Sequence, residues 1–183
     1  MRKIKKFGDK KLIIRLLEKS DIKRAAGFKR YINDLVDDDT AYIAKKEKVT
    51  LKEEREWIKS RLKEIKEKQR VTLIVEDGGK IISTSSVFLP KFLIQKHVAG
   101  LGIAVLKDYR GRGLGTYLMR EVIKLAKKKL KPKPEMIKFG VFANNKIAVS
   151  LYKKMGFRAV AKIPKQFKLK GKYFDEIIMI KNV

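Results

Sequence analysis

The spacing of apolar residues in the first part of the chain predicts a strand followed by a helix. The apolar positions within 11–15 are arranged as in an extended segment. Ser20 and Asp21 offer N-cap chemistry for a helix over about 22–36. The acidic run 37–39 ends this helix, so we expect a loop there.

A second helix and a hairpin are predicted next. Thr50 and Glu53 have the spacing of a capping box, in which each side chain bonds the backbone N–H of the other residue. Apolar residues over 51–65 then fall mostly on one side of a helix. The β-branched and apolar segments 71–76 and 81–89 flank an Asp-Gly-Gly turn, which is typical of a β-hairpin.

The second half of the chain alternates strands with helices. The first predicted elements are a strand over 97–106, a helix over about 113–129 and a strand over 136–142. A short helix then begins at Asn144-Asn145 and ends before Gly156. The last two strands, over about 158–162 and 173–181, flank a loop at 170–172. No linker or internal repeat interrupts this series. We therefore expect one domain over 1–183, of mixed α/β (α+β) class with a largely antiparallel sheet.

The composition narrows the class of protein. Hydrophobic residues make up 44% of the 183 residues, enough for a proper core. Apolar runs stay short of the roughly 18 residues of a membrane span, and the basic segment 1–6 lacks the apolar stretch of a secretory signal. A soluble, cytoplasmic protein that makes no membrane contact is therefore expected. The chain has no cysteine and one histidine, His97, so we expect neither disulfides nor a metal site.

The charge balance is strongly positive. There are 47 Lys and Arg residues against 20 Asp and Glu, which gives a formal net charge of +27 and invites polyanions as partners. The basic residues are scattered, however, with the main run at 127–134, whereas nucleic-acid-binding elements concentrate them among aromatic residues. Direct nucleic-acid binding is therefore an alternative that the pattern does not favour. The lysine-rich, cysteine-free composition also resembles that of heat-adapted proteins.

A glycine-rich turn at 110–116 leads into the predicted helix over 113–129. The N–H groups at a helix start are unpaired and, with the helix dipole, attract anions, while glycines let a phosphate approach the backbone closely. The turn fits neither G-x-G-x-x-G, because Thr116 takes the place of the last glycine, nor the P-loop pattern. A phosphate cradle is the favoured interpretation, and a tight strand-to-helix turn is the structural alternative.

Two segments of the second half carry a family signature. The first is Arg110-Gly111-Arg112-Gly113-Leu114-Gly115, and the second is 141–157, in which Asn145, Ala148, Tyr152, Gly156 and Phe157 match N-x-x-A-x-x-x-Y-x-x-x-G-F. The first looks like the [RQ]-x-x-G-x-[GA] pyrophosphate motif, and together they resemble the GNAT superfamily of acetyl-CoA-dependent N-acetyltransferases. The similarity is tight over 97–157 and looser elsewhere. Segment 171–176 suggests the branch that acetylates ribosomal proteins or protein N-termini.

The resemblance implies a GNAT-like sheet that is splayed and flanked by helices, and acetyl-CoA as cofactor. The implied cofactor contacts are Ile103, Ala104, Val105, Arg110, Gly111, Arg112, Gly113, Leu114, Gly115, Thr116, Asn145, Ala148 and Tyr152. The backbone of 103–105 would hold the pantetheine arm together with Asn145, and the N–H groups of 110–116 would bind the pyrophosphate. Tyr152 would be the general acid, because a phenol near pKa 10 can share a proton with a departing thiolate near 8.5.

The base that accepts a proton from the amine is missing from the expected positions. Many members of the family place a Glu on the strand before the glycine turn or on the strand before the Asn, but this chain has Gly100 and Gly140 there. One substitute for this base is water, relayed by backbone carbonyls, that takes the proton from the amine. Glu53, Glu54 and His97 are weaker candidates, each with a structural role as the alternative. The acidic run 37–39 is either a device that steers a cationic amine or a solvated loop.

Three hypotheses follow. The first is direct transfer of an acetyl group from acetyl-CoA to a protein or peptide amino group, at an N-terminus or a lysine, without a covalent enzyme intermediate. The second keeps this chemistry but takes a small amine of the polyamine type as acceptor. The third is a non-catalytic protein that binds CoA or nucleic acid. The sequence does not indicate the oligomeric state.

Overall fold

The structure is a computed structural model that describes residues 1–40, 42–43, 47–169 and 171–183. The strands are β1 (Arg2–Phe7), β2 (Lys10–Leu16), β3 (Arg70–Asp77), β4 (Lys80–Phe88), β5 (Val98–Val105), β6 (Met136–Phe142), β7 (Arg158–Leu169) and β8 (Lys172–Asn182). The helices are α1 (Ala25–Asp37), α2 (Leu51–Lys66), α3 (Leu114–Lys129) and α4 (Lys146–Lys154), with short 3-10 turns η1 (Lys19–Arg24), η2 (Leu93–Gln95) and η3 (Lys107–Tyr109).

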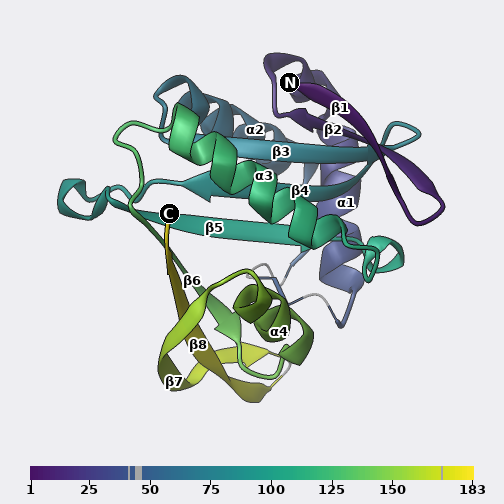
Figure 1. Ribbon diagram of the computed structural model, residues 1–183. Coiled ribbons are helices and arrows are strands. Elements are labelled where there is room, and N and C mark those ends of the chain that lie inside the picture. The colour runs from purple at the N-terminus through teal and green to yellow at the C-terminus, as the bar shows by residue number, and fades with distance from the viewer. Residues whose placement is uncertain (41, 44–46, 170) are drawn as a thin grey trace.

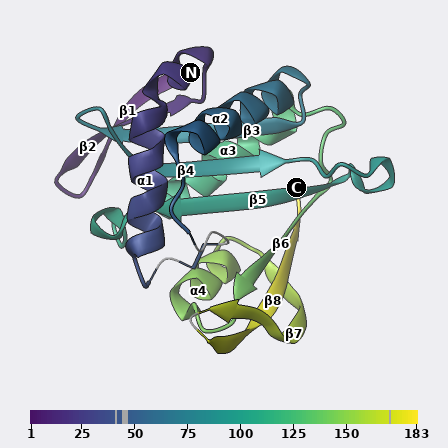
Figure 2. The ribbon, with the colours of Figure 1, turned by 180° about the vertical axis from the view of Figure 1, so that it is seen from behind.

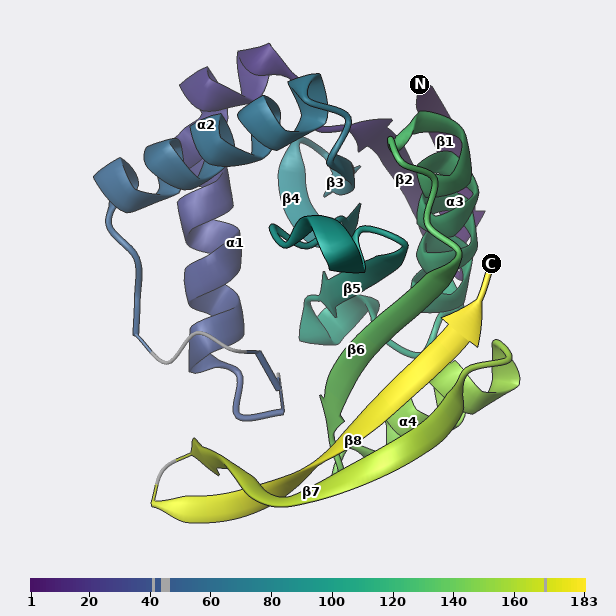
Figure 3. The ribbon, with the colours of Figure 1, turned by 90° about the vertical axis from the view of Figure 1, so that its left-hand side faces the viewer.

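Within the described residues the strands form one open sheet in the order β1-β2-β3-β4-β5-β6-β8-β7. Neighbouring strands run antiparallel, except that β5 and β6 pair in parallel. Figures 1 and 2 show α3 and α4 on one face of the sheet and α1 and α2 on the other, and Figure 3 shows this division edge-on. This arrangement confirms the predicted mixed fold with a splayed, mostly antiparallel sheet flanked by helices.

The core lies where β3 and β4 are covered on both faces. Every residue of β3 from Arg70 to Glu76 is buried, which is why its sequence is a continuous β-branched and apolar run rather than an alternating one. The inner stripe of α3 is fully buried, and each such large aliphatic side chain contributes about 2 kcal/mol through its removal from water. The stripe consists of Leu114, Leu118, Met119, Val122 and Ala126. No helix among the described residues is long and apolar enough to cross a membrane.

Local capping explains where several helices begin and end. Thr50 N donates to Glu53 Oε2 at 2.7 Å and Glu53 N donates to Thr50 Oγ1 at 3.2 Å, so the predicted capping box of α2 is confirmed. Asn145 caps α4, as Ala148 N donates to its Oδ1 at 3.1 Å. Gly156 follows α4 with φ of 84°, a left-handed conformation that favours glycine.

The N-terminal region differs from the sequence prediction. No element was predicted before residue 11, yet β1 pairs with β2 along its whole length. Only Phe7 of β1 is buried, so the strand lacks the apolar alternation that would reveal it. The final hairpin is also longer than predicted, because β7 is mostly exposed and its pairing with β8 is interrupted by register shifts, so its sequence lacks a regular apolar alternation. Lys170, in the predicted loop at 170–172, lies outside the described residues.

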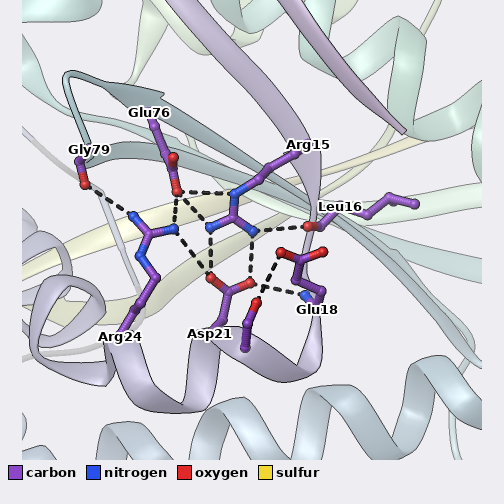
Figure 4. A network of polar contacts seen from close by, with 8 residues as sticks. Arg15, Leu16, Glu18, Asp21, Arg24, Glu76 and Gly79 are labelled. Atoms are coloured by element: carbon purple, nitrogen blue, oxygen red, sulfur yellow. Dashed lines mark hydrogen bonds and ion pairs between the residues drawn. The ribbon is translucent and has the colours of Figure 1, made fainter.

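The predicted cap at Ser20-Asp21 is also corrected, because Asp21 lies inside η1 and its carboxylate is fully buried. Arg15 on β2 donates to Asp21 through two nitrogens at 2.8 and 2.6 Å, and to Glu76 on β3 at 3.0 and 2.5 Å (Figure 4). Arg24 adds a second guanidinium to Glu76 at 2.5 Å. The network ties the turn before α1 to the sheet, and so fixes where α1 lies.

Candidate active site

The sheet opens into a fork between β5 and β6. The two strands pair only at Val98 with Met136 and at Ala99 with Ile137, and then diverge (Figure 1). Beyond this point, the edge of β5 that faces β6 has no strand partner among the described residues. A ligand with amide groups can therefore pair with the backbone of β5 as an added strand would.

The backbone groups that face the fork can be identified by alternation along β5. The carbonyl of Ala104 is taken from the β4 side, since Tyr31 Oη donates to it at 2.9 Å and Ser83 Oγ at 2.7 Å. Successive strand residues present their N–H and C=O to opposite edges. The N–H and C=O of Ile103 and the N–H of Val105 therefore point into the fork. Tyr31, on α1, was not found by sequence reasoning; burial raises its pKa to about 12, so it remains a neutral donor.

The glycine turn places an uncapped helix end at the mouth of the fork. Gly111 and Gly113 have φ of 72° and 78°, and Gly113 is the N-cap of α3 without a side-chain cap. The first N–H that pairs inside the helix is that of Tyr117, which donates to Gly113 O at 3.1 Å. The N–H groups of residues 114–116 therefore point out of the helix end toward any anion placed there.

Gly115 keeps this region open. A Cβ on Gly115 would meet Ile103 of β5 at 3.9 Å and Leu151 of α4 at 3.7 Å, which are ordinary contacts. Packing therefore does not demand a glycine here, but a longer side chain would project between the two elements that border the fork. An uncapped helix of 16 residues, positive-φ glycines and an open strand edge together fit a diphosphate attached to an amide-containing arm.

The side chains of the two motif arginines point away from this cradle. Arg110 donates from Nε to Val105 O at 2.8 Å and from its terminal nitrogens to Thr40 Oγ1 at 2.7 Å and Asp38 Oδ2 at 2.6 Å. Arg110 thus joins the glycine turn to the segment after α1. Burial would raise the pKa of Asp38, but hydrogen bonds from Thr40 and Arg110 outweigh it and lower that pKa.

Arg112 and the carboxylate of Asp37 also have partners. Arg112 forms an ion pair with Asp9 in the turn between β1 and β2. Asp37 pairs with Lys48 at 2.9 Å. At least two carboxylates of the run 37–39 therefore form ion pairs, Asp38 with Arg110 and Asp37 with Lys48. If the run steers a cationic amine, these carboxylates do so in addition to their structural role.

Tyr152 on α4 borders the fork from the α3 and α4 face of the sheet. Its ring packs edge-to-face on Phe139 of β6, with centroids 4.6 Å apart, and near Phe157 at 6.3 Å. Burial raises the pKa of Tyr152, so the phenol keeps its proton at neutral pH. Within the described part of the chain no hydrogen bond occupies its hydroxyl. Half-buried Ala148 lies one turn earlier on the same short helix, and the N-cap residue Asn145 lies two turns earlier.

The opposite face of β6 carries an aromatic cluster that sequence reasoning did not find. Phe142 stacks on Phe167 of β7 with centroids 4.0 Å apart, and lies 5.0 Å from Tyr42 and 6.0 Å from Phe174. Asn144 donates from Nδ2 to Tyr42 Oη at 3.0 Å. The cluster brings the segment between α1 and α2 to the end of β6. Its members come from four separate parts of the chain, so no local pattern reveals it.

The candidate bases have different surroundings. Glu53 is held by the capping box, and Glu54 is one of the buried residues of α2. His97 is exposed just before β5, at the closed end of the fork. No group of three or more His, Asp or Glu side chains in the described ranges is arranged to hold a metal ion. At Gly100 the ring of Phe88 fills the side-chain space, and at Gly140 the carboxyl of Glu176 fills it.

Comparison with known proteins gives consistent matches. A model of the acetyltransferase (GNAT) family matches residues 28–157. An L-amino acid N-acetyltransferase of Escherichia coli (strain K12) is 33% identical over 101 residues, which is 55% of this chain and 61% of the relative. The chain thus spans about three fifths of the length of the curated relative that it matches.

Solved structures match over more of the chain. A ribosomal-protein-alanine N-acetyltransferase from Brucella melitensis superposes with a TM-score of 0.78, 23% identity, and 93% of this chain and 99% of that one covered. A putative acetyltransferase from Salmonella typhimurium with its cofactor acetyl-CoA has a TM-score of 0.78, 21% identity and 93% coverage of both chains. At these identities the likeness establishes the fold.

Proposed function

We propose that this chain, which belongs to the acetyltransferase (GNAT) family, transfers the acetyl group of acetyl-CoA to the α-amino group of a polypeptide. The observation that carries the proposal is the fork itself. One side offers the unpaired N–H groups of 114–116 and the free edge of β5, and the other offers a protonated phenol at Tyr152. This combination suits a ligand that has a diphosphate at one end and an activated acyl group at the other.

Each part of the fork has one task in this proposal. Acetyl-CoA supplies a thioester whose carbonyl carbon an amine can attack. The N–H groups of 114–116 hold the diphosphate, and the fork-facing backbone of Ile103 and Val105 pairs with the amides of the arm. The Asn145 side chain caps α4 through Oδ1, which leaves its Nδ2 free to donate to the arm. Tyr152 holds a proton for the sulfur that departs. With no cysteine in the chain to carry the acetyl group as a thioester, we expect direct transfer from donor to acceptor.

An α-amino group is the less demanding acceptor. Keeping an amine of pKa about 7.8 neutral at pH 7 costs about 1 kcal/mol, whereas a lysine at about 10.4 costs about 4.6 kcal/mol. The name of the Brucella melitensis neighbour, a ribosomal-protein-alanine N-acetyltransferase, supports a polypeptide acceptor. The E. coli relative is named for L-amino acids, and this observation favours a second candidate, the α-amino group of a free amino acid.

A competition assay tests the proposal. The enzyme is incubated with acetyl-CoA and equimolar peptide with a free N-terminus, the same peptide N-terminally blocked but containing lysine, a mixture of L-amino acids, and spermidine, and products are followed by mass spectrometry. We expect a gain of one acetyl group on the free peptide N-terminus. Acetylation confined to the amino acids would establish the second candidate, and spermidine as the preferred acceptor would move the enzyme to the polyamine class. No acetylated product with any acceptor would refute acetyl transfer altogether.

A further inference from the structure

A carboxylate on β8 lies next to one of the two positions where the expected base is missing. In the register of the sheet, Phe142 on β6 faces Glu176 on β8, and Gly140 faces Ile178. The side chain of Glu176 leans diagonally along β6 and covers Gly140. A Cβ built on Gly140 would overlap the Glu176 carboxyl, with Oε1 the nearest atom and Cγ at 3.0 Å. A carboxylate thus occupies the side-chain space of Gly140, although β6 itself carries no acidic residue there.

This carboxylate differs from the other shielded acids of the protein. Glu64, Glu76 and Asp38 each accept hydrogen bonds from arginine, and the pKa of each is lowered. Glu176 has no hydrogen bond or ion pair among the described residues, although the chain carries a net charge of +27. Burial raises its pKa. An unpaired, half-buried carboxylate is costly for stability, and such groups gather at functional sites.

The surroundings of Glu176 on each strand are mainly apolar. Its cross-strand neighbours are Phe142 on β6 and Ile163 on β7. The adjacent Asp175 points to the other face, because successive strand residues alternate, and is paired with Lys162 at 2.8 Å. The charged residues on the face of Glu176 are Lys138 of β6, Arg158 of β7 and Lys172 of β8 itself. All three are exposed and lie two or more register positions away. From the α1 to α2 segment, Tyr42 packs on Phe142.

The β6 side of the fork thus carries a phenol on one face of the sheet and a carboxylate on the other. Phe139 contacts Tyr152, and the next residue, Gly140, presents its open side-chain position to the other face, where Glu176 lies. In an acyl transfer the nucleophile and the leaving group are bonded to the carbonyl carbon in different directions, so two separate groups on opposite faces can serve them as base and acid. The face of Glu176 is also the one that α1 and α2 cover (Figure 3).

We propose that Glu176 is the catalytic base, which accepts a proton from the acceptor ammonium group in the space above Gly140. The proposal rests on the acetyltransferase function proposed above. The ammonium loses one proton to a Glu176 oxygen, and its nitrogen lone pair forms the bond to the acetyl carbon as the carbon–sulfur bond breaks. Tyr152 gives its proton to the sulfur, and the second proton lost by the nitrogen restores the phenol. Glu176 returns its proton to solvent, so the net products are an amide, a thiol and one proton.

The first test replaces Glu176 by its uncharged isostere. Glu176→Gln is expected to lower kcat/KM for the peptide about 10²-fold or more at pH 7, the usual contribution of a positioned general base. The deficit shrinks as the pH approaches the pKa of the amine, because more of the amine is then neutral without help. Binding of acetyl-CoA, measured by calorimetry, stays within about twofold of wild type. Asp175→Asn is the matched control, since it removes the same charge from the next residue and is expected to change kcat/KM less than about twofold.

The second test moves the carboxylate from one strand to the other. Glu176→Ala vacates the space above Gly140, so the double variant Glu176→Ala/Gly140→Glu can place a carboxylate there from β6. We expect this variant to be at least tenfold more active than Glu176→Ala, and Glu176→Ala/Gly140→Gln to show no such gain. Rescue by Glu but not by Gln separates proton transfer from packing, because the two side chains have the same size.

A titration without substrate provides a readout other than activity. Carboxyl-labelled protein followed by ¹³C NMR should show one glutamate that titrates above the ordinary value of 4.5 and disappears in Glu176→Gln. A Glu176 that titrates at or below that value would contradict the proposal, as would a Glu176→Gln variant with wild-type kcat/KM and an unchanged pH profile. In either case peptide acetylation by the wild-type enzyme would still stand. Loss of acetylation in the wild type itself would instead remove the proposed function and this base with it.

Discussion

Tyr152 keeps its proton because burial disfavours the phenolate. Its ring is fixed between Phe139 and Phe157 on one side of the fork, and its hydroxyl is not spent on a structural hydrogen bond within the described residues. A group held in this state can give a proton to a departing thiolate without first breaking another contact. At the scale of single residues, the packing of α4 therefore leaves the Tyr152 hydroxyl able to act as a proton donor.

Tyr152→Phe removes the proton and leaves the ring. We expect kcat to fall about 10²-fold while the Kd of acetyl-CoA, measured by calorimetry, changes less than about twofold. Tyr173→Phe is the control, because Tyr173 is 57% exposed on β8 and lies outside the fork. Equal kcat values for Tyr152→Phe and wild type would remove Tyr152 as the acid.

The buried network around Arg15 makes a prediction about pH. Burial would raise the pKa of Glu76, but hydrogen bonds from Arg15 and Arg24 outweigh it and lower that pKa below 4.5. The stabilisation is therefore complete above pH 4.5 and is lost as the pH falls through the lowered value. Burial opposes the charge of Arg15 as well, but Asp21 and Glu76 raise its pKa, so the guanidinium does not titrate in this range.

Arg15→Met leaves two carboxylates without their main partner. We expect the free energy of unfolding to fall by about 3 kcal/mol or more at pH 7, because breaking a buried ion pair leaves uncompensated charges. The variant should also lose less stability than wild type between pH 5 and pH 3. Urea unfolding followed by circular dichroism at pH 7, 5 and 3 measures both effects, and identical midpoints for the two proteins at pH 7 would contradict the account.

At the scale of elements, Arg110 connects the glycine turn to the segment between α1 and α2. Its guanidinium bonds Asp38 and Thr40 rather than the cradle, although the motif alone suggested a phosphate contact. The cofactor side and the α1 side of the fork are therefore tied together by one side chain. This side chain helps to hold the segment whose Tyr42 packs on the aromatic cluster.

Arg110→Gln tests whether the Arg110 side chain organises the α1 side of the fork or binds the phosphates of acetyl-CoA. If the side chain organises the α1 side, KM for the peptide acceptor should rise severalfold while the Kd of acetyl-CoA changes less than about threefold. The measurements are initial rates with varied peptide and calorimetry with acetyl-CoA. A loss confined to acetyl-CoA affinity, with unchanged peptide KM, would assign the side chain to the phosphates instead.

Elements with strong local signals could be predicted from the sequence, and elements held by distant partners could not. β6 matches its predicted bounds, and the caps at Thr50 and Asn145 use side chains that act within one turn. β1 was missed because an exposed edge strand needs no apolar alternation. The glycine turn and Tyr152 were found through their motifs. The direction of the Arg110 side chain and the placement of Glu176 over Gly140 depend on strand order, which no local pattern contains.

At the scale of the whole molecule, the net charge of +27 suits an anionic cofactor without defining its site. The described basic side chains are distributed over all parts of the fold, and several of them are already paired with carboxylates. Specific recognition must therefore come from fixed backbone geometry rather than from the surrounding field. The sheet supplies this geometry by pairing β5 with β6 at one end and separating them at the other.

The most direct measurement is a titration of ¹⁵N-labelled protein with acetyl-CoA, followed through the backbone amide resonances of Leu114, Gly115 and Thr116. If these N–H groups hold the diphosphate, their resonances shift with the saturation of the protein, and S-acetylpantetheine, which lacks the diphosphate, leaves them nearly unmoved. Equal shifts with both compounds, or saturable binding of acetyl-CoA that leaves the three resonances in place, would contradict the account.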